Sequence, residues 1–212
     1  MSPRCPDCGR PTMLDAFSGE GGSAVGYDRA GFCVTGVDIN PQPRYPFTHV
    51  AGDAVNYIRE HGHEFAAVTG SPTCQFFARV TRWRGKREAH ENLIPATRDA
   101  MVETGRPWVI ENVMEAAVSG ELRPDLVLCG SMFGLKVRRH RAFETSWRAL
   151  QLTPRCAHQP DAVPFGHKDE ARFKTALGCD WMTNLGGRQA IPPAFTEHIG
   201  DALLAHLAAA AA

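Results

Sequence analysis

The sequence predicts an open α/β sheet with helices packed on its faces. Short apolar runs rich in small and β-branched residues start at Met13, at Cys33 and at Phe65, and each has the length of a buried strand. The first run leads into the glycine-rich residues 18–22 and then into a helix that ends at Gly31. A strand, a glycine turn and a helix in this order let a ligand approach the backbone closely and meet the N-terminus of the helix.

Acidic residues follow the glycine turn and two of the strands. Glu20 lies inside the turn, where it would repel a pyrophosphate, so a ligand with a positive centre fits better; an ordinary tight turn is the alternative. Asp38 ends the second strand and can accept hydrogen bonds from ribose hydroxyls. Asp53 follows a third strand over residues 48–51 and could accept from an exocyclic amine, and it is also placed to cap a helix over residues 54–60. This layout is typical of a pocket for a nucleoside-type cofactor.

Cys74 lies where the strand over residues 65–69 gives way to a loop. Gly70 and Pro72 break the strand, so the thiol is placed just past its carboxyl end, the edge at which open α/β sheets bind ligands. A basic run over residues 79–87 follows. Positive charge near a thiol lowers its pKa and favours the nucleophilic thiolate, and the same charges can hold phosphates. The alternative is a small buried thiol with no reactive role.

Charged residues interrupt the apolar runs in the middle of the chain. Residues 92–104 have helical spacing, and residues 108–113 form an apolar strand that contains Glu111. An unpaired buried carboxylate is costly, so we expect Glu111 to be a site residue or one half of a satisfied pair. The arginines within residues 137–144 suit either a solvated edge strand or the binding of bases and phosphates.

Composition and charge indicate a globular domain with a real core. The chain has 212 residues and 43% hydrophobic content, which suits one domain, or one domain with a small appendage. The formal net charge is zero, which excludes a global field that attracts nucleic acid, so such binding depends on local patches. No apolar run is long enough to span a membrane. The first residues lack the apolar region of a signal peptide and the cysteines number seven, so we expect reduced thiols and a cytoplasmic location.

Cysteine and histidine residues at two distant places suggest a structural zinc site. Cys5 and Cys8 form a Cys-x-x-Cys pair followed by glycine, which is one half of a common zinc knuckle. A structural zinc ion needs two more ligands, and Cys156 with His158 is the pair that the composition offers. The alternative is a reduced N-terminal tail without metal. With metal, a zinc-stabilised binding module becomes a further function class.

The order of these motifs resembles that of the DNA cytosine-5 methyltransferases, most closely the small forms found in bacteriophages. The resemblance covers residues 13–145 and again residues 186–204. Its specificity comes from the order, since no single motif is decisive. The segments that carry it are the first cofactor motif (14–22), the Pro-Cys-Gln catalytic loop (70–75), the Glu-Asn-Val motif (111–113), the paired arginines (139–141) and the last motif (189–193, then 199–200).

The resemblance implies a Rossmann-like class I fold of the S-adenosylmethionine (SAM)-dependent methyltransferases, a mixed seven-stranded sheet with helices on both faces. It divides the chain into an N-terminal tail (1–12), a catalytic core (13–145), a short irregular segment in place of a target-recognition domain (146–187) and a C-terminal part (188–212). A helix over residues 193–211, after paired prolines, returns this last part to the core. The resemblance implies SAM contacts, with Glu20 near the sulfonium, from Phe17, Ser18, Gly19, Glu20, Gly21, Gly22, Asp38, Ile39, Asp53, Ala54, Pro72, Gln189 and Ile191.

The resemblance also implies a covalent mechanism on cytosine. Cys74, with Gln75 beside it, would attack carbon 6 and turn carbon 5 into a nucleophile. Glu111 would hydrogen-bond ring nitrogen 3 and the exocyclic amine, and Arg141, paired with Arg139, would hold the carbonyl oxygen. In a duplex the cytosine must leave the stack. A mobile loop would then close over it and supply the DNA contacts of Arg79, Arg82, Arg84, Lys86 and Arg87.

The chain departs from the family pattern at several positions. Thr73 stands where the family has proline, Ala78 replaces a serine, Val137 replaces the glutamine of the arginine motif, and residues 188–189 replace Gly-Asn. Residues 146–187 are much shorter than a target-recognition domain. The alternatives are therefore carbon-5 modification of free cytidine nucleotides, a catalytic subunit with a separate DNA-recognition partner or a homodimer, and a catalytically weak binding protein. For a phage gene, the expected location is the host cytoplasm.

Overall fold

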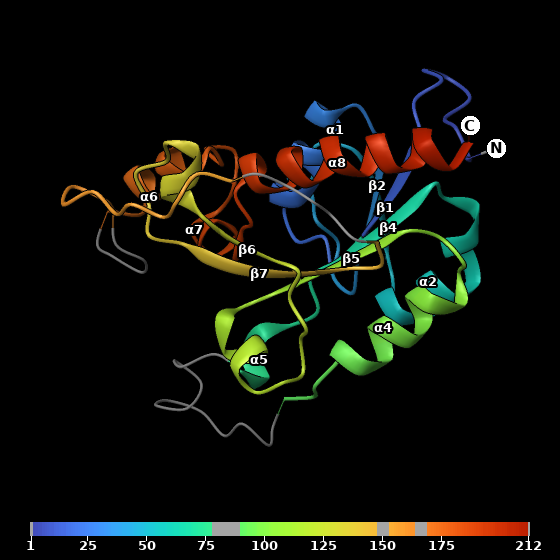
Figure 1. The fold of residues 1–212 in the computed structure, drawn as a ribbon, viewed down its shortest axis with the longest axis horizontal. Coiled ribbons are helices and arrows are strands. Elements are labelled where there is room, and N and C mark those ends of the chain that lie inside the picture. The colour runs from blue at the N-terminus through green and yellow to red at the C-terminus, as the bar shows by residue number, and fades with distance from the viewer. Residues whose placement is uncertain (1, 78–89, 148–152, 164–168, 212) are drawn as a thin grey trace.

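The structure, a computed structural model, describes residues 2–77, 90–147, 153–163 and 169–211. Seven strands form one sheet in the order β3-β2-β1-β4-β5-β7-β6, with helices on both faces (Figure 1). The chain builds outward from β1 to one edge and from β4 to the other, so the strand order reverses between them. Ligands bind outside the carboxyl ends of the strands at such a reversal. The predicted mixed seven-stranded sheet is confirmed.

The sheet is parallel except at one strand. β1 pairs in parallel with β2 and β4, and β3 and β5 extend this arrangement, whereas β7 runs antiparallel to both β5 and β6. Parallel central strands are buried on both faces, which explains their continuous apolar runs. The strands are β1 (Thr12–Ala16), β2 (Cys33–Asp38), β3 (Thr48–Ala51), β4 (Ala67–Gly70), β5 (Trp108–Asn112), β6 (Leu126–Cys129) and β7 (His140–Thr145).

Each face of the sheet is covered by a pair of helices. Helices α1 (Gly22–Ala30) and α8 (Pro193–Ala211) lie on one face, and α2 (Ala54–His61) and α4 (Ile94–Glu103) on the other (Figure 1). None of the helices in the described part of the chain has the length and apolar character needed to cross a membrane. The remaining helical pieces are short: η1 (Gly62–Glu64), η2 (Cys74–Phe76), α5 (Met114–Val118), η4 (Gly130–Phe133), α6 (Glu170–Leu177) and α7 (Asn184–Gln189).

The predicted elements agree with the structure except near their ends. The C-terminal helix has the predicted bounds, and the helices predicted over residues 54–60 and 92–104 are α2 and α4. The strand predicted from Phe65 begins later, at Ala67, because Phe65 instead closes a 3-10 turn with its N–H bonded to Gly62 O. Gly70, predicted as a strand breaker, is the last residue of β4 and pairs with Ala16.

Successive residues of the central strands pack on opposite faces of the sheet. Met13 of β1 belongs to the core under α1 and α8, whereas Leu14 belongs to the core under α2 and α4. Helices α1 and α8 make a close contact at Gly26 of α1. A Cβ atom at this position would lie 2.0 Å from Thr196 Oγ1 of α8. Thr196 Oγ1 also donates a hydrogen bond to Ser23 O. The last part of the chain is thereby held against helix α1, which follows the glycine turn.

The described part of residues 146–187 includes a helix that the sequence did not predict. The described end of this segment contains α6, capped by Asp169, whose side chain accepts from Arg172 N, and the start of α7. Phe173 and Leu177 of α6 are buried in a third apolar cluster together with Val137 of the core. The prolines and mixed charges of this segment obscured a helix whose apolar side chains recur four residues apart.

Candidate active site

A cavity of about 560 Å³ lies at the carboxyl ends of the central strands. Its walls are the turn after β1, the tips of β2 and β5, the start of α2, the loop after β4, and residues 182–191. All the predicted cofactor contacts except Gly21 line it, as do the predicted catalytic residues except Arg139. The lining that sequence analysis predicted is Phe17, Ser18, Gly19, Glu20, Gly22, Asp38, Ile39, Asp53, Ala54, Pro72, Cys74, Gln75, Glu111, Arg141, Gln189 and Ile191.

The turn after β1 is built from unusual backbone conformations. Phe17 has φ of 57°, the left-handed region, which costs a non-glycine residue about 1–3 kcal/mol. Gly21 is also left-handed, and a Cβ there would lie 2.7 Å from Pro46 Cδ, so Gly21 shapes the turn from behind the cavity. A Cβ at Gly22 would lie 2.5 Å from Ile191 O. Glycine here lets the C-terminal part close the cavity beside the turn.

Two predicted acids line the cavity and also fasten its wall. Asp38 accepts from Gly19 N at 3.0 Å and from Asn40 N at 3.1 Å. Asp53 caps α2, accepting from Asn56 N at 2.8 Å, as the sequence predicted. A carboxylate offers about four acceptor positions, so both side chains retain capacity toward a ligand.

Glu20 has a structural partner that the sequence did not indicate. Its carboxylate accepts hydrogen bonds from Thr183 N and Oγ1, and its backbone oxygen accepts from Trp181 Nε1 at 2.9 Å. These contacts fasten the loop before α7 to the glycine turn and place Met182 and Leu185 in the cavity wall. Sequence analysis assigned neither to the cofactor site, since nothing local distinguishes them from core residues.

Asp15 is a further residue that sequence analysis missed. It is 2% exposed on β1, lines the cavity, and accepts a hydrogen bond from Tyr45 Oη at 3.2 Å. Burial raises the pKa of Asp15 to about 8. The available signal was a carboxylate inside an apolar strand, the same signal that identified Glu111.

The loop that carries Cys74 is fixed to two strands. Ser71 N donates to Ala16 O of β1, and the buried side chain of Asn112 on β5 donates to Pro72 O at 2.8 Å. Cys74 then opens the 3-10 turn η2 with its side chain at the cavity. Asn112 therefore has a positioning role, which its place in the Glu-Asn-Val motif alone did not specify.

The groups around Cys74 shift the pKa of its thiol in opposite directions. Burial raises the pKa of the thiol and the Glu111 carboxylate adds to this, whereas Arg141 and, more weakly, Arg139 lower it. Among the described residues burial prevails, and the lowering expected from the basic run over residues 79–87 stays a prediction. The residues expected to supply that lowering and the DNA contacts, Arg79, Arg82, Arg84, Lys86 and Arg87, lie outside the described residues.

Glu111 and Arg141 form a buried ion pair beside Cys74. Glu111 Oε1 lies 2.8 Å from Arg141 Nε, and the two side chains are 8% and 15% exposed. Burial raises the pKa of Glu111, while the Arg141 charge opposes the rise. Arg139, predicted to share the catalytic role, is buried away from the cavity and donates to Arg188 O at 3.0 Å. Its contact ties the start of β7 to the end of α7.

The predicted zinc ligands do not come together as one set. Cys156 and His158 lie with Cys129 and His140 at one place, and Cys5 and Cys8 lie with Cys33 at another. The predicted four-ligand set is therefore wrong. Its two pairs could not be assigned from the sequence because each pair completes its cluster with residues far along the chain.

Comparison with known proteins identifies the fold. No known family model matches the chain, and no curated protein matches it. The methyltransferase EhMeth of Entamoeba histolytica superimposes with a TM-score of 0.60 over 93% of this chain and 99% of its own, at 11% identity. The Dnmt2 methyltransferase of S. pombe gives a TM-score of 0.45 at 19% identity, over 64% of this chain and 49% of its own. A SAM-dependent methyltransferase of Agrobacterium tumefaciens gives 0.32 at 16% identity, over 49% and 39%. The mixed seven-stranded sheet and the likeness to EhMeth show that the chain has a Rossmann-like class I methyltransferase fold.

Proposed function

We propose that this chain is a SAM-dependent methyltransferase that modifies carbon 5 of cytosine in DNA, with Cys74 as the covalent nucleophile. The observation that carries the proposal is one cavity that joins two kinds of wall. One wall has the glycine turn with Asp38 and Asp53, and the other has Cys74 beside the Glu111–Arg141 pair. The fold, shared with a methyltransferase from Entamoeba histolytica, supports the choice of cofactor.

The cofactor wall fits the chemistry of SAM. The cavity volume of about 560 Å³ is within the range for small-molecule sites. Asp38 would accept from the ribose hydroxyls and Asp53 from the adenine amine, while Phe17 and Ile191 offer apolar surface. When bound, SAM supplies the activated methyl group that carbon 5 receives.

The reactive wall fits covalent activation of cytosine. The Cys74 thiolate forms a bond to carbon 6, and the displaced electron pair moves toward carbon 5 and ring nitrogen 3. Burial raises the pKa of Glu111, which favours sharing of a proton between its carboxyl group and nitrogen 3 as negative charge develops on the ring. Arg141 would donate to the carbonyl oxygen of the base. After methylation, a base removes the proton from carbon 5, and the electron pair of that C–H bond re-forms the double bond to carbon 6. The sulfur of Cys74 leaves carbon 6 as the thiolate, and the proton on nitrogen 3 returns to Glu111.

The position of Cys74 implies that the base leaves its stack. The thiol lies at a cavity among the carboxyl ends of strands, which a stacked base in a duplex cannot reach. The basic run over residues 79–87 remains the proposed contact with the DNA backbone. A separate recognition partner or a homodimer would extend the surface that residues 146–187 offer.

The test is methyl transfer from labelled SAM to duplex DNA, single-stranded DNA and dCMP in parallel, with mass spectrometry of the product nucleosides. We expect 5-methylcytosine in DNA, and sequencing of the product would give the target site. Modification of dCMP alone would replace DNA with free nucleotides as the substrate. A methyl group on any other atom of the base would overturn the mechanism. Binding of SAM without transfer would favour the reading that a recognition partner is required.

A further inference from the structure

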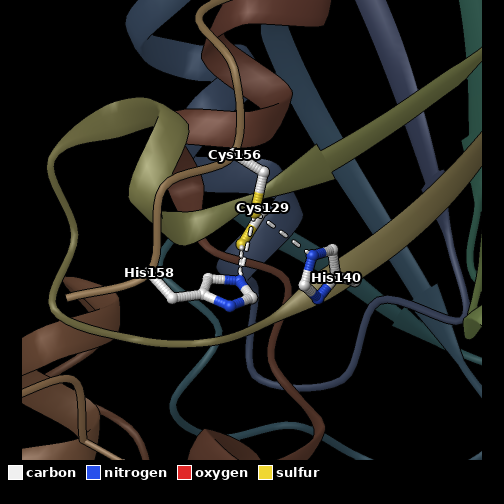
Figure 2. A group of neighbouring side chains, drawn as sticks. All are labelled: Cys129, His140, Cys156 and His158. Carbon is white, nitrogen blue, oxygen red and sulfur yellow. Dashed lines mark hydrogen bonds between the residues drawn. The ribbon is translucent and has the colours of Figure 1, made fainter. Parts of the chain in front are cut away.

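Four side chains that can bind a metal ion converge at the edge of the sheet formed by β6 and β7 (Figure 2). Cys129 ends β6, His140 begins β7, and Cys156 and His158 come from the segment that follows β7. Their ligand atoms all lie within 4.8 Å of one another. We refer to these four residues as the Cys129 cluster. None of them lines the active-site cavity.

The distances within the Cys129 cluster are close to those of a tetrahedral zinc site. His158 Nε2 lies 3.1 Å from Cys156 Sγ and 3.3 Å from Cys129 Sγ, and His140 Nε2 lies 3.4 Å from Cys156 Sγ. Ligands at ordinary Zn–S and Zn–N lengths on a tetrahedron would place sulfur roughly 3.6 Å from nitrogen. An expansion of a few tenths of an ångström would therefore admit the ion.

The chemistry of the Cys129 cluster selects zinc over other common ions. Two thiols and two imidazoles form a Cys2His2 set, which suits zinc, whereas magnesium and calcium prefer oxygen ligands. A thiol is a weak hydrogen-bond donor, so thiol–imidazole hydrogen bonds alone are a poor reason to gather these side chains. Ser131 Oγ lies 3.5 Å from both Cys129 Sγ and Cys156 Sγ, where its hydroxyl can support thiolate charge.

We propose that Cys129, His140, Cys156 and His158 hold one zinc ion, which fastens the chain after β7 to the edge of the sheet. Four protein ligands fill a tetrahedral site, so the ion has a structural role without an open position for catalysis. Residues 153–162 contain no helix or strand. Their direct attachments include Ala157 N to Ser131 Oγ at 3.1 Å and Arg138 Nη2 to Gln159 O at 3.3 Å. A metal ion adds a strong constraint where these bonds are few.

The metal site also affects Arg139, which directly precedes β7, and Arg141 of β7. His140 stands between Arg139, which contacts the end of α7, and Arg141, which pairs with Glu111. An ion on His140 would fix the start of β7 and so position both arginines. This consequence rests on the proposed function, whereas the metal site itself does not.

The structure contains a second group of possible metal ligands, and a measurement of metal content must distinguish it from the Cys129 cluster. Cys5, Cys8 and Cys33 form a group of three thiols, and within the described residues no fourth ligand joins them. Arg10 Nε donates toward Cys8 Sγ at 3.4 Å, so a cation already lies beside this group. The two clusters differ in composition, which makes them distinguishable by variants and by spectroscopy.

The test is metal content of the purified full chain after equilibration with zinc and removal of loosely bound ion, measured by mass spectrometry of the elements. We expect one zinc ion per chain in the wild type and in the control Cys5→Ser/Cys8→Ser. We expect nearly none in Cys156→Ser/His158→Asn. Both of these ligands are exposed, so their replacement leaves the core intact. A wild type that holds no zinc, or zinc lost only from the control, would overturn the proposal.

Three further measurements do not depend on the ligand variants. Cobalt added to the metal-free wild type should give the absorption bands of a tetrahedral Cys2His2 site. Octahedral cobalt or a three-thiolate spectrum would contradict the proposed ligand set.

Ser131→Ala keeps all four ligands and should weaken zinc binding by about 10-fold. Chelation of the wild type should speed proteolytic cleavage within residues 153–163, and an unchanged rate would remove the proposed fastening role. Since no methyl transfer is measured, failure here leaves the proposed function untouched.

Discussion

The two ends of the active-site cavity each contain a buried carboxylate on a central strand, but the partners differ. Asp15 on β1 lies at the cofactor end and accepts from the neutral hydroxyl of Tyr45. Glu111 on β5 lies at the reactive end and pairs with the cation of Arg141. Burial raises the pKa of both groups, but only Glu111 has a positive charge in direct contact that opposes the rise.

Under the proposed function, this difference makes Asp15 a structural acid and Glu111 the acid that acts on the base. A carboxyl group beside a neutral hydroxyl is stable in its protonated form and can serve as a fixed hydrogen-bonding part of the wall. A carboxyl group shared with a buried cation and close to a thiol can change its proton occupancy as a base binds. The same sequence signal, an acid within an apolar strand, therefore has two outcomes that depend on the partner.

The largest effect is expected at the reactive end, for Cys74→Ala. Removing the nucleophile should reduce methyl transfer by about 10⁴-fold or more, because no bond to carbon 6 can form. SAM binding should survive, since the cofactor wall is unchanged. Transfer to DNA and calorimetric binding of SAM measure the two effects separately. Cys8→Ser, an exposed thiol outside the cavity, is the matched control.

A trapping experiment tests the same step directly. DNA with 5-fluorocytosine cannot lose a proton from carbon 5, so the bond to Cys74 should persist and give a denaturation-resistant complex. The complex should form with the wild type and with Cys8→Ser but not with Cys74→Ala. Retained turnover in Cys74→Ala would remove this residue as the nucleophile.

Glu111→Gln should have the next largest effect. The amide keeps the shape and can still accept from Arg141, but it cannot transfer a proton to ring nitrogen 3. We expect turnover to fall by about 10²–10³-fold, as for the loss of one donor to developing charge. Single-turnover rates at saturating DNA and SAM measure the effect. A rate within a few-fold of the wild type would assign Glu111 a purely structural pairing with Arg141.

Asp38→Ala tests the cofactor end. Leaving ligand hydroxyls and the N–H groups of Gly19 and Asn40 without this acceptor should weaken SAM binding by about 1–3 kcal/mol. Turnover with saturating SAM should change much less than in Glu111→Gln. Calorimetry on Asp38→Ala and on Asp7→Ala, an exposed acid outside the cavity, gives the comparison. Unchanged affinity would contradict the assignment of this wall to SAM.

Much of the fold follows from local sequence. Helix α8 has the predicted bounds because Pro193 marks its start and its apolar residues repeat with helical spacing. The central strands were predictable because burial on both faces requires unbroken apolar runs. Cys74, Asp38 and Asp53 all line the cavity, because each lies at or just past the carboxyl end of a strand.

The parts that could not be predicted depend on contacts between distant segments. Arg139 and Arg141 are two residues apart, which in a strand would place them on one face, but β7 begins at His140 and only Arg141 enters the cavity. Thr183 reaches Glu20 across most of the chain. Cys129 was indistinguishable from an apolar strand residue until the fold brought Cys156 beside it.

Of these variants, Asp15→Asn should change turnover least. It should raise the melting temperature, whereas Glu111→Gln should lower it. The pKa of Asp15 is raised from 3.8 to about 8 on folding, so its stabilising contribution is complete below pH 4 and is lost as pH rises toward and through 8. Asparagine mimics the protonated form and can still accept from Tyr45, so the variant should gain melting temperature over the wild type between pH 5 and 8. Each kcal/mol corresponds to about 2–4 °C in a chain of this size.

The variant Glu111→Gln serves as a control for this prediction. Glu111→Gln removes the charge that balances buried Arg141, so it should lower the melting temperature, whereas Asp15→Asn removes a charge that has no cationic partner in direct contact. Asp7→Asn, an exposed acid, should follow the wild type at every pH. An Asp15→Asn advantage that did not grow from pH 5 to pH 8 would mean that Asp15 is ionised in the fold. The carboxyl groups of Asp15 and Glu111 would then differ in their position in the cavity and not in their protonation.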